Sequence, residues 1–141
     1  MMKRIGEGRM SYKRLTQFND IIKEEKFSEW ANNPRGMGDS RRKIYIDSVQ
    51  KLEKEIYRFV EDNPEFRLNT YGKILEQNGI MWNAASMRMA DVSKLDGQCI
   101  MALLVGVVRA ERFIDGAVLL PFLRDGVIQN WLDRLESLDQ G

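Results

Sequence analysis

Two arginines and two acidic residues follow the most apolar stretch of the sequence, which runs from Cys99 to Val108. Arg109 and Arg112 stand one helical turn apart, so they could form a fork that binds a carboxylate or another anion. Glu111 and Asp115 could orient that fork. A structural role is favoured, because arginines that leave so apolar a helix need partners. In that role the cations stabilise the helix dipole, and an i,i+3 pair between Arg112 and Asp115 locks the following turn.

Residues suited to catalysis are scarce. The chain has no histidine, which removes the commonest general base and metal ligand together with the Ser–His and Cys–His pairs. Cys99, the single cysteine, lies in an apolar run where a thiol is usually an inert packing group. Asp91 and Asp96 lack neighbouring nucleophiles or further ligands, and helix capping accounts for both. We therefore predict that the protein is not an enzyme and has no cofactor and no metal site.

A soft apolar segment is formed by Trp82 with Met81, Met87 and Met89. Methionine-rich segments can make adaptable binding surfaces, and they can also fill irregular cores, which is the favoured interpretation here. Trp82 is a candidate binding residue in addition to Arg109, Glu111, Arg112 and Asp115. The three tryptophans could also form a patch shared between two copies of the chain, which predicts a homodimer: Trp30, Trp82 and Trp131.

The elements that must position these residues are helical. Apolar residues spaced by three or four, together with breakers between them, predict helices over 12–31, 41–62, 70–78, 93–113, a short stretch ending at 125, and 128–138. Residues 80–92 are ambiguous, with some helical content. The stretch 93–113 is apolar on every side, which indicates a buried central helix, and Ser93 with Asp96 predicts a capping box at its start. Asn69 or Thr70 is expected to cap the 70–78 helix.

These patterns predict an all-α fold, a compact single-domain helical bundle of about six helices around a buried central helix, with no significant sheet. The domain is expected to span residues 12–141, with residues 1–11 a disordered or non-native N-terminal extension. A chain of 141 residues with 43% apolar residues can bury one core. The longest apolar run is about half of what a membrane span needs. With a single cysteine and no signal sequence, a cytoplasmic protein is expected.

Charge argues against binding driven mainly by phosphate neutralisation, because the formal net charge is only +1. Residues 1–62 carry 14 Lys and Arg against 11 Asp and Glu, while residues 63–141 carry 8 against 10. The basic clusters Lys13-Arg14 and Arg41-Arg42-Lys43 could touch phosphates. A solvated surface is favoured for them, because acidic residues follow each cluster.

Several motifs in the second half resemble a family of small uncharacterised bacterial proteins, a domain of unknown function. The most specific is Arg109-Ala110-Glu111-Arg112-Phe113 with Asp115-Gly116, and Trp131-Leu132-Asp133-Arg134-Leu135 looks like the family's closing helix. The resemblance covers about residues 66–138 and brings no activity with it. It implies an accessory or mobile-element protein.

The function predicted from the sequence is a non-enzymatic α-helical protein-interaction module. The resemblance adds the hypothesis that it binds and inhibits a host or defence protein. The alternative is a nucleic-acid-binding accessory protein that uses the basic N-terminal half.

Overall fold

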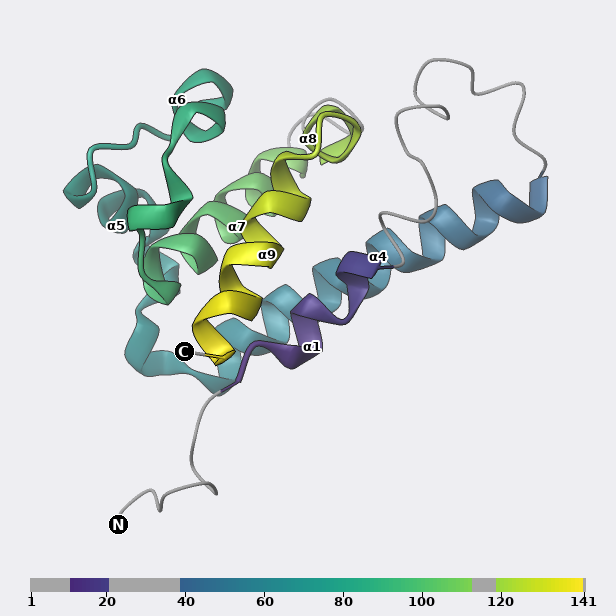
Figure 1. The fold of residues 1–141 in the computed structure, drawn as a ribbon, viewed down its shortest axis with the longest axis horizontal. Helices are drawn as coiled ribbons and strands as arrows, with labels where there is room; N and C mark the ends of the chain where they lie inside the picture. Colours follow the sequence, from purple (N-terminus) through teal and green to yellow (C-terminus); the bar gives the residue numbers. More distant parts are fainter. Residues whose placement is uncertain (1–10, 21–38, 113–118, 141) are drawn as a thin grey trace, which may run out of the picture.

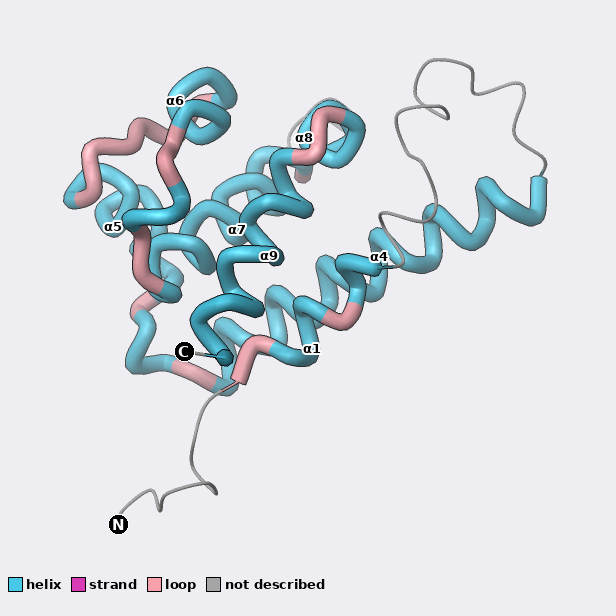
Figure 2. Tube along the Cα trace, viewed as in Figure 1, coloured by secondary structure: helices cyan, strands magenta, loops and turns pink. Residues whose placement is uncertain are grey.

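The computed structural model describes residues 11–20, 39–112 and 119–140 (Figures 1 and 2). Its α-helices are α1 (Lys13–Thr16), α4 (Asp39–Asp62), α5 (Tyr71–Gln77), α6 (Ala84–Met89), α7 (Gly97–Glu111), α8 (Leu119–Arg124) and α9 (Val127–Gln140). Single 3₁₀ turns form η2 (Pro64–Phe66), η3 (Leu68–Thr70) and η4 (Val92–Lys94). These three ranges contain no strand. The predicted all-α fold is confirmed, and the described ranges alone contain these seven α-helices where about six were expected.

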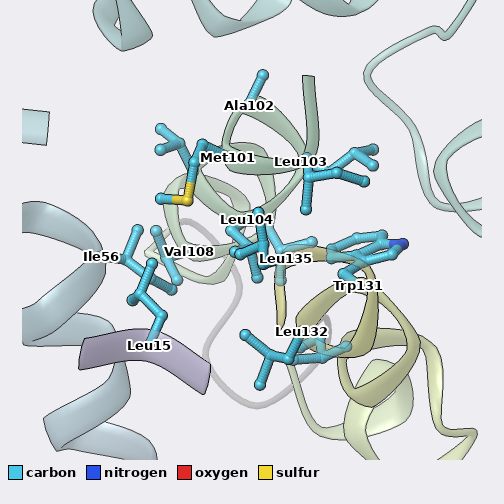
Figure 3. Packing of buried hydrophobic residues seen from close by; sticks show 14 of the residues in the cluster. Leu15, Ile56, Met101, Ala102, Leu103, Leu104, Val108, Trp131, Leu132 and Leu135 are labelled. Atoms are coloured by element: carbon cyan, nitrogen blue, oxygen red, sulfur yellow. The ribbon is translucent and has the colours of Figure 1, made fainter. Parts of the chain in front are cut away.

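Helix α7 is the central helix, as its composition predicted. Every residue from Cys99 to Val108 is buried. The helix packs against α4, α5, α8 and α9, so its apolar side chains find partners in every direction. In Figure 3, Leu104 lies between Ile56 of α4 and Leu135 of α9.

The start of α7 differs from the prediction. Its N-cap is Asp96, whose carboxylate accepts a hydrogen bond from Cys99 N at 2.9 Å, so the helix begins at Gly97. The predicted capping box of Ser93 with Asp96 is wrong. Ser93 instead donates from its hydroxyl (2.6 Å) and its N–H (3.2 Å) to Asp91, which holds the separate turn η4. Both acidic residues act as caps, as predicted, but on two different elements.

Helix α4 confirms the predicted 41–62 helix and begins two residues earlier. Its buried stripe has the expected spacing: Val49, Leu52, Ile56 and Phe59. The predicted 12–31 helix is described only as far as residue 20. There α1 covers Lys13–Thr16, a turn follows, and helix resumes at residues 18–20. The remainder of that predicted helix, and residues 1–10, lie outside the described residues.

The two ends of the described chain are joined (Figure 1). Asp139 of α9 accepts hydrogen bonds from Ser11 Oγ at 3.2 Å and from Tyr12 N at 2.9 Å. The Tyr12 ring stacks on Phe59 at 5.6 Å, and its hydroxyl points at the start of α7. A Cβ added to Gly97 would lie 1.8 Å from that hydroxyl oxygen. A side chain at position 97 would therefore collide with the Tyr12 ring, which explains the glycine there.

Turns follow the sequence signals with one exception. Gly79 and Gly126 take the left-handed conformation, at φ +76° and +79°, and follow α5 and α8 as predicted. Pro121 is the third residue of α8, within its first turn. The exception is Thr70, which precedes α5 without capping it, because its hydroxyl donates to Arg67 O at 2.8 Å.

Candidate functional site

An apolar patch marks the segment that contains α6. The large hydrophobic side chains that are exposed among the described residues are Met81 (69% exposed), Trp82 (45%) and Met89 (84%). We call these three residues the methionine–tryptophan patch. The prediction that the methionines fill the core is correct only for Met87, which is 3% exposed. For Met81 and Met89 it is wrong.

Trp82 is exposed on one side and fixed on the other. Its indole Nε1 donates a hydrogen bond to Gly106 O at 3.0 Å, and its ring meets Tyr71 edge-to-face at 5.3 Å. A Cβ on Gly106 would come within 3.3 Å of the indole and 3.2 Å of the Met87 side chain. The absence of a side chain at position 106 thus lets the indole lie directly against α7. This arrangement fixes the orientation of the ring.

Further contacts hold the segment around the patch. Asn83 caps α6 by accepting from Ser86 N at 2.8 Å, while Ser86 Oγ accepts from Met81 N at 2.8 Å. At the other end of α6, Arg88 pairs with Asp125 at 2.6 Å and lies over the Phe122 ring at 4.6 Å. The segment is therefore fastened at both ends, so the patch is presented on a supported surface.

The arginine cluster is only partly assembled as the sequence predicted. The guanidinium carbons of Arg109 and Arg112 both lie near the ring of Tyr57 in α4, at 5.6 and 5.1 Å from its centroid. Glu111 points to α8, where its Oε1 accepts a hydrogen bond from Leu119 N at 2.8 Å. Asp115 lies outside the described residues, so the lock between Arg112 and Asp115 stays a prediction. The partner that sequence reasoning missed is Tyr57, which is remote in the chain.

The tryptophan patch proposed for a homodimer is wrong in one member. Trp131 is only 1% exposed and meets Phe122 edge-to-face at 5.7 Å in the core. Trp30 lies outside the described residues. Of the three tryptophans, Trp82 is therefore the one with a described exposed face.

The first basic cluster lies on the surface, as predicted. Arg14 is 68% exposed in its side chain and pairs with Glu55 at 3.5 Å, and Arg58 pairs with the same carboxylate at 3.6 Å. A shared acidic partner reduces the positive field available to a phosphate. The side chains of Arg41-Arg42-Lys43 lie outside the described residues.

Cys99 is fully buried, which confirms its predicted packing position. Burial raises the pKa of its thiol from 9.0 to about 11, and the Asp96 carboxylate adds to the effect. The thiol of the unfolded chain therefore loses its proton at a lower pH than the thiol of the folded chain. The stability that this group contributes is complete below about pH 9 and is lost as the pH rises toward 11.

We expect Cys99→Ala to lose less melting temperature between pH 9 and pH 11 than the parent loses, because the variant has no thiol to ionise. Melts of both proteins at pH 7 give the baseline for the smaller side chain. Tyr12, whose pKa burial raises to about 12, is present in both proteins and cancels in the comparison. Parallel loss of melting temperature in the two proteins would contradict the expectation.

Within the described ranges, no helix has both the length and the apolar character needed to cross a membrane. No group of three or more His, Cys, Asp or Glu side chains in those ranges is placed to hold a metal ion. No protein-family model, no curated protein and no solved structure matches the chain. The resemblance to a family of uncharacterised bacterial proteins accordingly stays a hypothesis.

Proposed function

We propose that this chain is a protein-interaction module that binds its partner through the methionine–tryptophan patch. One observation carries the proposal. The large hydrophobic side chains that are exposed in the described structure all fall between residues 81 and 89. Scattered exposed hydrophobics need no explanation, whereas a gathered group is typical of an interaction site.

The chemistry of the three side chains suits protein recognition. Tryptophan is among the residues that contribute most to binding energy, and an aromatic ring fixed beforehand loses little freedom on association. Trp82 has that fixed position, because Gly106 O and Tyr71 hold its ring. Met81 and Met89 are unbranched and polarisable, so they can adapt to the partner's surface around this anchor. A rigid aromatic group beside two adaptable groups favours an apolar partner surface.

The resemblance noted in the sequence suggests the biological setting of such a partner. A small accessory or mobile-element protein of this kind would bind a host or defence protein and inhibit it. A second copy of the chain is another occupant of the same patch, and light scattering at high micromolar concentration distinguishes a dimer from a monomer. Both occupants require the patch to be free in the isolated chain.

Pull-down with the full chain from a bacterial lysate, before and after nuclease treatment, tests the proposed class of partner. We expect a stoichiometric protein partner to remain after nucleic acid is digested, because the patch is apolar and Arg14 and Arg58 share an acidic partner. Loss of every partner on nuclease treatment would instead support the alternative, a nucleic-acid-binding accessory protein.

A further inference from the structure

A second feature, sharing no residue with the methionine–tryptophan patch, is a surface pocket of about 440 Å³ between α4, the η2–η3 turns and α7. One part of its wall is apolar and consists of Val60, Pro64 and Leu68. The other part is polar, with Tyr57 of α4, Arg109 of α7, and Arg67 and Asn69 of the turns. A volume of this size and a mixed lining are typical of sites for small molecules.

Two polar atoms of this pocket's lining residues are buried without hydrogen-bond partners. They are the hydroxyl of Tyr57 and Nε of Arg109, and neither finds a partner among the described residues. A buried donor left unpaired costs free energy, so native structures leave few of them. Both groups can donate, and they come from two different helices that meet at one pocket.

The backbone of the pocket wall is also unusual. Arg67 has φ +55°, and among the described residues other than glycine it alone has a left-handed backbone. That conformation costs an arginine free energy that a glycine would not lose. Its N–H donates to Pro64 O, and its own carbonyl accepts from Thr70, so η2 and η3 meet at this residue. A strained residue that lines a pocket beside unpaired donors points to a role in binding.

The charge around the pocket is positive. Arg67 and Arg109 line it, and Arg112 lies beside Tyr57 at the same end of α7. Glu61 is the acidic residue among the lining side chains, and it is exposed. Three guanidinium groups against one exposed carboxylate leave an excess that attracts an anion.

We propose that this pocket binds a small organic oxyanion, a carboxylate or a phosphate that carries a short apolar portion. The Arg109 Nε–H and the Tyr57 O–H donate hydrogen bonds to the oxyanion, and the Arg67 guanidinium adds charge. The apolar portion lies against Val60 and Leu68. Because both donor atoms are buried in the free chain, the two side chains turn toward the pocket on binding, and the oxyanion then pairs with the donors.

Nuclear magnetic resonance titration of the full chain tests this inference, with three probes at constant ionic strength: butyrate, inorganic phosphate and the neutral analogue butyramide. We expect saturable shifts of the Arg109 Nε signal and of the amides of residues 67–69 with at least one anion. Stronger binding of butyrate identifies a carboxylate ligand, and stronger binding of phosphate identifies a phosphate ligand. The absence of saturable shifts with either anion, or equal binding of butyramide, would overturn the inference.

Two variants separate binding from folding. Tyr57→Phe removes the unpaired hydroxyl and keeps the ring, and Arg67→Gly removes the charge together with the backbone strain. Each should weaken anion binding by about tenfold and raise the melting temperature by about 3 °C. The matched control is Lys51→Gln, which removes one charge from an exposed position of α4 and should leave binding unchanged.

A variant pair that melts lower than the parent and binds anions equally well would show that the two side chains serve the fold alone. If Lys51→Gln weakens anion binding as much as the two pocket variants do, the binding depends only on the overall charge of the chain. That result would likewise overturn the inference. The inference stands or falls separately from the proposed protein partner, because none of these variants touches the methionine–tryptophan patch.

Discussion

Leu104→Asp should lower the free energy of unfolding by more than about 4 kcal/mol. Leu104 is 1% exposed, near the middle of a helix whose residues from Cys99 to Val108 are all buried. An aspartate there would place a charge among the apolar side chains of α4 and α9 (Figure 3). Chemical denaturation followed by circular dichroism measures the change in the free energy of unfolding. We expect little folded Leu104→Asp protein even without denaturant.

The matched control is Met89→Asp, which introduces the same charge at an 84% exposed position. It should change the free energy of unfolding by about 0.5 kcal/mol or less. A soluble Leu104→Asp protein that unfolds cooperatively at the parent's midpoint would show that α7 is not the centre of the core.

Trp131→Ala should cost about 3–5 kcal/mol of the free energy of unfolding, as large-to-small substitutions of buried aromatic residues do. Trp131 is 1% exposed and packs edge-to-face on Phe122, so it joins α9 to α8. The surrounding helices relax only partly into the cavity left by the indole, because α7 packs against both α8 and α9.

The conservative variant Trp131→Phe keeps an aromatic ring and should lose less than half as much. Thermal melts of the three proteins give the comparison. Equal stability of Trp131→Ala and the parent would place this side chain on the surface, where the sequence alone had suggested it could join a shared patch.

The fold was predictable because its strongest signals are local. The stretch that became α7 is apolar on every side, and the stripe in α4 recurs every three or four residues, so each pattern determines burial without knowledge of the partner helix. The closing helix behaves in the same way, because Trp131 shares its apolar face with Ile128 and Leu135 and all three are buried. This position on the apolar face is incompatible with a role for Trp131 in a patch shared between two copies.

The candidate sites were less predictable because they depend on contacts between remote residues. Met81, Met87 and Met89 are the same residue type in one short segment, and only the packing of α6 on α7 decides that Met87 points inward. The bond from Trp82 to Gly106 spans 24 residues. One usable signal was present, since a glycine inside so apolar a helix indicates close approach of another group.

The arginine cluster shows the same limit. Spacing predicts that Arg109 and Arg112 emerge one turn apart, and both do reach one site. Spacing cannot predict that this site is the ring of Tyr57, because that contact arises from the packing of α4 against α7. The cap of α6 could have been predicted from the sequence, because asparagine is a preferred N-cap residue. Its side-chain oxygen accepts from the backbone N–H three residues later, which here is that of Ser86.

The central claim is that the methionine–tryptophan patch is the surface that binds a partner protein. Quantitative capture from nuclease-treated lysate, by the parent and by the double variant Met81→Lys/Met89→Lys, tests it most directly. Trp82 is left intact because its bond to Gly106 supports the fold. The control variant Ser137→Lys/Gln140→Lys adds the same two charges at exposed positions of α9.

Melting temperatures of the three proteins should agree, since every substituted side chain is exposed. The account predicts that the control retains the parent's stoichiometric partner and that the patch variant loses at least about tenfold of the captured protein. Undiminished capture by a folded Met81→Lys/Met89→Lys protein would contradict the account.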